Sequence, residues 1–121
     1  MTSCLVVDDS RMIRRVASRI LKDLKFETSE AENGQIALDM CRMDMPDAIL
    51  LDWNMPVMDG LSFLKDLRSN EDGKKPIVIF CTAERDIEKI TAAIEAGADE
   101  YIMKPFDSDI ITSKFQLAGL I

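Results

Sequence analysis

The chain has 121 residues, of which 47% are hydrophobic and 31% are charged, and its net charge is −7 with no histidine. A chain of this length and composition is typical of one globular domain with one core. Its acidic balance argues against binding to nucleic acid, which requires clustered Lys and Arg on the protein. Without histidine, a zinc site would need cysteines and carboxylates.

Two further features bear on where the protein works. No apolar stretch approaches the ~20 residues of a membrane-spanning helix, and the N-terminus lacks a signal-peptide pattern. The three cysteines, Cys4, Cys41 and Cys81, are scattered, which is typical of reduced, buried thiols. We therefore expect a cytoplasmic protein that does not contact membranes.

Hydrophobic periodicity predicts strands and helices in strict alternation along the chain. In order, the expected elements are a strand at 3–7, a helix that follows Ser10 and runs to about Lys25, a strand at 26–31, a helix at 36–43, a strand at 47–52, a helix at 61–68, an exposed loop at 70–75, a strand at 77–81, a helix at 86–96, a strand at 101–103 and a helix from Asp107 or Ser108 to Leu120.

The spacing of apolar residues predicts which helix faces pack on the sheet. The first helix has an apolar stripe made of Ile13, Val16, Ala17, Ile20, Leu21 and Leu24. The fourth helix has one made of Ile87, Ile90, Ala93 and Ile94. The basic residues Arg11, Arg14, Arg15, Arg19 and Lys22 are expected on the solvated face of the first helix.

Alternation of this kind implies a parallel sheet with helices on both faces and right-handed crossovers. The fold class that suits this size is α/β, a single-domain, doubly wound (βα)5 sandwich of the flavodoxin-like type. Its parallel five-stranded sheet is expected to have the order 2-1-3-4-5. Residues 1–121 are predicted to form this one domain, without a linker or a second domain.

Several predicted strands end next to side chains that can carry chemistry. Asp8 and Asp9 follow the first strand, Asp52 ends the third, Thr82 follows the fourth and Lys104 follows the fifth. In this strand order the groups share one edge of the sheet, so we expect them to converge. Taken singly, each has a simpler explanation, such as a helix cap, a charge at a helix N-terminus or a solvated strand end.

Three carboxylates at one edge repel one another unless a cation compensates them. Oxygen ligands without His or Cys favour Mg²⁺ or Mn²⁺, and Mg²⁺ commonly keeps waters and phosphate oxygens as its other ligands. An Asp in such a place can be a nucleophile that forms an aspartyl-phosphate, while Thr82 and Lys104 can bind phosphoryl oxygens. These residues therefore predict a site for phosphoryl transfer.

The same residues lie in motifs that resemble those of the receiver domains of two-component response regulators. The motifs are Val6-Val7-Asp8-Asp9-Ser10, LDWNMPVMDG at 51–60, Phe80-Cys81-Thr82-Ala83-Glu84, Ala96-Gly97-Ala98 and Lys104-Pro105-Phe106. They span the whole chain in the right order. The resemblance implies that Asp52 is the phosphoacceptor, and that Asp8, Asp9, Asp52 and the backbone carbonyl of Asn54 ligate the metal.

The resemblance also implies a switch made of Thr82, which moves toward the phosphoryl group, and Tyr101, which turns inward with it. Lys104 is expected to contact a phosphoryl oxygen, and the Lys104–Pro105 peptide bond is expected to be cis, which proline makes possible at modest cost.

By the same resemblance, the phosphoryl group comes from a sensor histidine kinase, a phosphotransfer protein or a small phosphodonor. The surface of the helix 86–96, the strand 101–103 and the last helix is then expected to bind a downstream protein. Such proteins catalyse their own phosphorylation and dephosphorylation but are not turnover enzymes. The sequence around Asp52 is most similar to single-domain, CheY-like chemotaxis regulators, so we expect no output domain. The polar rim and the net charge indicate a monomer.

Other functions stay open at this point. Single-domain receivers also serve as phosphorelay shuttles and in stress or cell-cycle pathways. A phosphoaspartate-type hydrolase would need a second Asp where Asn54 stands, because an amide cannot act as a general acid. A flavin site would need a loop rich in Gly or hydroxyl groups after the first strand. An interaction module that works without phosphorylation is the remaining alternative.

Overall fold

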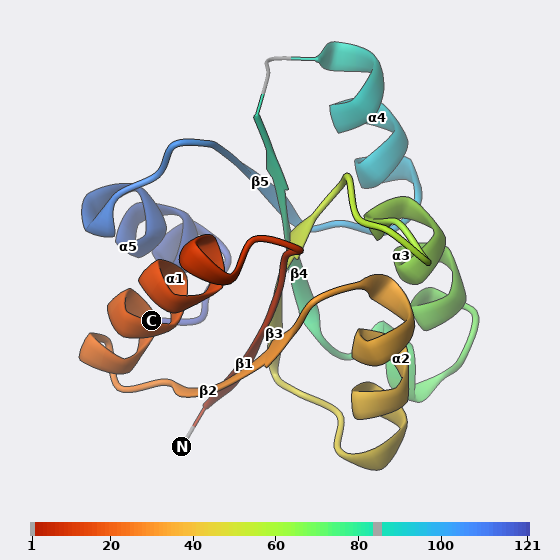
Figure 1. Cartoon of the computed structure of the whole chain (residues 1–121), viewed down its shortest axis with the longest axis horizontal. Coiled ribbons are helices and arrows are strands. Elements are labelled where there is room, and N and C mark those ends of the chain that lie inside the picture. The colour runs from red at the N-terminus through yellow and green to blue at the C-terminus, as the bar shows by residue number, and fades with distance from the viewer. Residues whose placement is uncertain (1, 84–85) are drawn as a thin grey trace.

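The computed structural model describes residues 2–83 and 86–121 (Figure 1), so Glu84, the last residue of one motif, lies outside the described residues. In these ranges five strands alternate with five α-helices, as predicted. The elements are β1 (Ser3–Val7), α1 (Arg11–Asp23), β2 (Glu27–Ala31), α2 (Gly34–Met43), β3 (Ala48–Asp52), α3 (Gly60–Arg68), the 3₁₀ helix η1 (Asp72–Lys74), β4 (Ile77–Thr82), α4 (Ile87–Glu95), β5 (Glu100–Met103) and α5 (Ser108–Leu117).

The strands form one parallel sheet in the order β2-β1-β3-β4-β5. Helices α1 and α5 cover one face of this sheet, and α2, α3 and α4 cover the other (Figure 1). Every residue of the central strand β3 is buried, because helices cover both of its faces. The predicted doubly wound (βα)5 fold and its strand order are confirmed.

Each face of the sheet has its own hydrophobic core. Under α1 and α5, the rings of Phe26 and Phe115 meet edge to face with centroids 5.4 Å apart. Under the other three helices, Trp53 packs edge-on against Phe80 at 5.1 Å. The three cysteines are buried and free, as expected from their spacing. Among the described residues, no helix is long and apolar enough to cross a membrane.

A side chain caps the N-terminus of each of the five described α-helices. Ser10, Asn33, Asp59, Asp86 and Asp107 each accept a hydrogen bond from a backbone N–H in the first turn of the following helix. At the other end of α4, Gly97 has a φ of 112° and stops the helix, as predicted. The Lys104–Pro105 bond is cis, which confirms that expectation.

Helices α1 and α5 end two and three residues earlier than predicted. Helix α1 ends at Asp23 instead of about Lys25, because Lys25 adopts the left-handed conformation with a φ of 73°. Helix α5 ends at Leu117 instead of Leu120, and Gly119 turns the chain there with a φ of 79°. The remaining bounds lie within two residues of the prediction.

Three residues of the predicted apolar stripes face solvent instead of the core. They are Val16 at 45% exposure, Ile87 at 73% and Ile94 at 45%. Helix α4 lies at the outer end of the layer formed by α2, α3 and α4 (Figure 1), so it has a helical neighbour on one side only. On this helix Ala93 is fully buried, whereas Ile87 and Ile94 form an uncovered apolar face.

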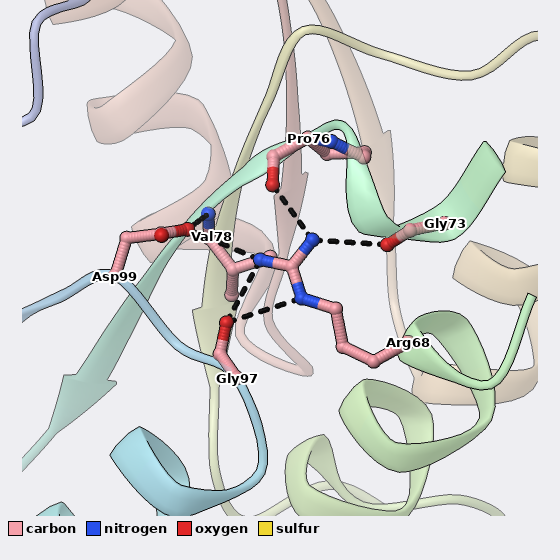
Figure 2. Close-up of polar contacts among 6 residues, drawn as sticks. All are labelled: Arg68, Gly73, Pro76, Val78, Gly97 and Asp99. Carbon is pink, nitrogen blue, oxygen red and sulfur yellow. Dashed lines mark hydrogen bonds and ion pairs between the residues drawn. The ribbon is translucent and has the colours of Figure 1, made fainter. Parts of the chain in front are cut away.

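The loop at 70–75, expected to be exposed, contains the helix η1 and the buried Gly73. Arg68 at the end of α3 holds this region together (Figure 2). Its guanidinium donates hydrogen bonds of 2.8–3.1 Å to the carbonyl oxygens of Gly73, Pro76 and Gly97, and it pairs with Asp99 at 3.1 Å. One side chain thus joins α3, η1 and the turn between α4 and β5.

Candidate functional site

Three of the predicted site residues meet at the carboxyl edge of the sheet. Lys104 follows β5, and its Nζ donates to Asp8 Oδ2 at 2.7 Å and to Asp52 Oδ1 at 2.9 Å. Both aspartates are buried, with exposures of 3% and 8%. The lysine therefore lies between a carboxylate that follows β1 and one that ends β3, which are neighbouring strands.

Asp9 completes an acidic cluster at this edge. Asp8, Asp9 and Asp52 each offer a carboxylate oxygen, and these oxygens lie within 4.8 Å of one another. Asp9 is exposed, whereas the other two are buried, so the cluster opens to solvent on one side. The sequence prediction that the three carboxylates converge is correct.

Burial and charge act in opposite directions on the protonation of the site. Burial raises the pKa of Asp52, and the hydrogen bond from Lys104 only partly offsets this rise. For Lys104, burial acts to lower the pKa, but the hydrogen bonds to Asp8 and Asp52 outweigh it and the pKa is raised. Lys104 therefore stays a cation and balances one of the three negative charges of the cluster.

The loop after β3 folds back closely on Asp52. The N–H of Gly60 donates to the carbonyl oxygen of Trp53 at 2.9 Å. A Cβ at Gly60 would overlap the carbonyl oxygen of Asp52, so this position accepts only glycine without a shift of the backbone. Asp59 caps α3 with a 2.8 Å hydrogen bond from Ser62 N–H. Asn54, the predicted carbonyl ligand, lies exposed in this loop.

Thr82 is the last residue of β4 and lies beside β5 at the same edge of the sheet. Its side chain is buried, with 4% exposure. Its carbonyl oxygen accepts a 2.8 Å hydrogen bond from the backbone N–H of Lys104, which holds the two residues next to each other. The structure thus brings Asp8, Asp9, Asp52, Thr82 and Lys104 to one edge.

Tyr101 lies apart from this cluster. It sits within β5, opposite Phe80 of β4, and its side chain is half-buried. The ammonium of Lys114 on α5 lies 4.5 Å from the centroid of its ring.

Arg14 is a site residue that the sequence analysis missed. Its guanidinium donates to the carbonyl oxygen of Asp8 at 2.8 Å and pairs with Glu30 at 3.1 Å. Arg14 was expected on the solvated face of α1, but its side chain is only 14% exposed. Helical spacing could have revealed this, because Arg14 precedes the buried Ala17, Ser18 and Leu21 by three, four and seven residues.

The residues present suit a hard divalent cation. Their ligand atoms are carboxylate oxygens. Mg²⁺ and Mn²⁺ prefer oxygen ligands, whereas softer metals prefer thiolates or imidazoles. One lysine balances only part of the negative charge of three carboxylates in a largely buried place. Both the donor set and the remaining charge therefore favour a cation at this edge.

Known proteins resemble this chain over most of its length. The family described as "Response regulator receiver domain" matches residues 4–116. The chain is 40% identical over 91% of its length to the chemotaxis protein CheY-3 of Vibrio cholerae, covering 85% of that protein. It is 37% identical over 93% of its length to the chemotaxis protein CheY of Pseudomonas aeruginosa, covering 91% of that protein.

A solved structure of a chemotaxis protein has the same fold as this chain. The crystallised chemotaxis protein CheY4 of Vibrio cholerae superimposes with a TM-score of 0.91, at 32% identity over 100% of this chain and 99% of the other. Since the family match and the relatives extend over most of the chain, this protein belongs to the family of response regulator receiver domains.

Proposed function

We propose that Asp52 accepts a phosphoryl group from a sensor histidine kinase, a phosphotransfer protein or a small phosphodonor. As a receiver domain the protein is a phosphorylation-dependent signalling switch, not a turnover enzyme. The observation that carries the choice of Asp52 is that its carboxylate accepts a hydrogen bond from Lys104 at 2.9 Å and lies within 4.8 Å of carboxylate oxygens of Asp8 and Asp9. An Asp Oδ held there can attack phosphorus while the bond to the donor's nitrogen or oxygen breaks.

We assign the metal site to Asp8, Asp9 and Asp52 with the backbone carbonyl of Asn54, and the ion to Mg²⁺, with Mn²⁺ as a substitute. When bound, the ion supplies positive charge to the phosphoryl oxygens. The ammonium of Lys104 and the hydroxyl of Thr82 would then bind other phosphoryl oxygens. These groups are positioned in advance by the sheet, which reduces the reorganisation needed for transfer.

The output is assigned to the surface of α4, β5 and α5. In this proposal Thr82 and Tyr101 shift together after phosphorylation and change this surface, which then binds a downstream protein. The exposed Ile87 and Ile94 of α4 support it, since they offer apolar contacts to a partner. Two relatives are named as chemotaxis proteins, which favours a role in chemotaxis over other signalling. We place the protein in the cytoplasm, as a monomer that binds neither nucleic acid nor membranes.

Trp53 is the only tryptophan and follows Asp52 directly, so its fluorescence tests the proposal. We expect Mg²⁺ to quench it, and beryllofluoride, a stand-in for a phosphoryl group, to cause a further saturable change. The variant Asp52→Asn should lose the beryllofluoride response, while Asp39→Asn, an exposed carboxylate on α2, should keep both responses. A full beryllofluoride response in Asp52→Asn would refute the assignment of the phosphoacceptor.

A phosphorelay shuttle is a second use of the same site. A shuttle would pass the phosphoryl group on to a histidine of a phosphotransfer protein, whereas a chemotaxis-type switch would hold it while bound to its target. Incubation of the phosphorylated protein with a purified phosphotransfer domain separates the two uses. The hydrolase alternative keeps no support from the site, since the exposed Asn54 offers an amide where that reaction needs an acid.

A further inference from the structure

The ring of Tyr101 lies under a cation that no step of the proposed function uses. Lys114 on α5 places its Nζ 4.5 Å from the ring centroid, within the range of a cation–π contact. The side chain of Lys114 is 25% exposed, so most of this side chain is shielded from water. The contact joins α5 to β5, two of the three elements that form the proposed output surface.

A carboxylate holds this lysine in place. Glu100 Oε1 accepts a hydrogen bond from Lys114 Nζ at 3.1 Å and a second one from the backbone N–H of Tyr101 at 3.0 Å. The Glu100 side chain is 24% exposed. Because one oxygen serves both donors, Glu100 fixes the ammonium relative to the backbone of the residue whose ring it covers.

We propose that Lys114 is a positioning residue that holds the ring of Tyr101 in its surface position. The attraction between the ammonium and the ring exists only while the ring lies beneath Lys114, so it stabilises this position relative to any other. The ring is half-buried here: it packs against the margin of the core under α2, α3 and α4 and lies next to a partly exposed ion pair. Lys114 would thus oppose the inward turn of Tyr101, a regulation that rests on the proposed function.

The size of the effect follows from the strength of such contacts. At a partly exposed site, a cation–π contact changes a two-state equilibrium by about two- to fivefold. A ligand that selects the inward state binds more weakly by the same factor while the contact exists. Removal of the ammonium should therefore tighten the binding of beryllofluoride about two- to fivefold.

The test uses the full chain with its single tyrosine replaced by 3-fluorotyrosine, so that one ¹⁹F resonance reports on Tyr101. Beryllofluoride is titrated in the presence of Mg²⁺, and both Trp53 fluorescence and the ¹⁹F signal are followed. Lys114→Gln should bind beryllofluoride about two- to fivefold more tightly than the unmodified protein and shift the ¹⁹F signal toward its saturated position. Lys114→Arg keeps a cation over the ring and should behave like the unmodified protein.

The matched control is Lys22→Gln, which removes the charge of an exposed lysine on α1 and should leave the affinity unchanged. Loss of a positive charge by itself weakens the binding of an anion, so the expected tightening has the opposite sign to a general electrostatic effect. Unfolding by urea, measured in parallel, shows that each variant is folded at the titration conditions.

The outcomes separate the two proposals. If beryllofluoride changes Trp53 fluorescence but Lys114→Gln binds it with unchanged or weaker affinity, the positioning role is wrong and the proposed function stands. If beryllofluoride changes neither signal in the unmodified protein, the proposed function fails. In that case a ¹⁹F signal of the ligand-free protein that is the same in Lys114→Gln also overturns the positioning role.

Discussion

At the scale of single residues, the acidic site depends on a neighbour that carries no part of the chemistry. Arg14 holds the carbonyl oxygen of Asp8 at 2.8 Å and is itself held by Glu30, which also accepts a hydrogen bond from Ser18 at 3.3 Å. The backbone that presents Asp8 and Asp9 is therefore fixed from α1 and β2. Residues that orient metal ligands in this way commonly affect metal affinity.

We expect Arg14→Gln to weaken Mg²⁺ binding about tenfold, because the Asp8–Asp9 backbone loses the group that orients it. The measurement is a Mg²⁺ titration followed by Trp53 fluorescence. The Mg²⁺ affinity of Arg14→Lys should lie between those of the unmodified protein and Arg14→Gln, since lysine keeps the charge but not the forked geometry of the guanidinium. Arg15→Gln, an exposed position on the same helix, is the control and should not weaken Mg²⁺ binding, because loss of a positive charge by itself favours the binding of a cation. An equal loss of affinity in Arg15→Gln would show that the weakening does not come from the contact between Arg14 and Asp8.

At the scale of elements, Arg68 connects parts of the fold that the strands alone do not. Its guanidinium fills the space between η1, the start of β4 and the turn before β5 (Figure 2). Asp99, its ionic partner, also accepts a 2.8 Å hydrogen bond from the backbone N–H of Val78. These contacts lie where β4 and β5 begin, at the sheet edge opposite the carboxylates.

Arg68→Met should lower the free energy of unfolding by about 3 kcal/mol, because three carbonyl groups and one carboxylate lose their donor. Mg²⁺ affinity should stay unchanged, since the site lies at the other end of the strands. Urea unfolding measures the first quantity, and Trp53 fluorescence the second. Arg42→Met removes an exposed pair with Asp39 and should change stability by less than about 1 kcal/mol.

The elements also show what sequence patterns can and cannot predict. Apolar runs such as 77–81 identified the buried strands, and the alternation of elements then gave the sheet order and the edge at which Asp8, Asp52 and Lys104 meet. Periodicity reports that a face is apolar but not which element covers it, so Ile87 and Ile94 were placed in the core. The hydrogen bonds of Arg14 and Arg68 go to carbonyl groups outside their own helices, five to 29 residues away in the chain, and hydrophobic periodicity does not identify these partners.

At the scale of the whole molecule, the acidic site lies at the carboxyl ends of the strands, whereas the stabilising contacts of Arg68 lie at their amino ends. The carboxyl edge gathers like charges that favour a cation, an arrangement that does not by itself stabilise the fold. The amino edge is held by Arg68, and both faces carry hydrophobic cores. Stability is therefore supplied by parts of the molecule that the proposed chemistry does not need to move.

Because its three thiols are buried, the free energy of unfolding of the protein should depend on pH. Burial raises the pKa of Cys4 from 9.0 to about 12, that of Cys41 to about 11, and that of Cys81 as well. In the unfolded chain a thiol ionises near its ordinary value, so above pH 9 the unfolded state releases protons that the folded state retains. Each buried thiol therefore contributes stability that is fully present below about pH 9 and is lost as the pH rises toward its folded pKa.

For Cys4 we expect this loss to reach about 1.4 kcal/mol between pH 8 and pH 10, one unit above the ordinary thiol pKa. Urea unfolding of the unmodified protein and of Cys4→Ala at both pH values isolates the contribution of Cys4, because the two proteins have every other titrating group in common. The variant is less stable at pH 8 through its small cavity, but its stability should fall less with pH, so the difference between the two proteins should narrow at pH 10. A difference that is the same at both pH values would mean that the thiol of Cys4 ionises as readily in the folded protein as in the unfolded chain.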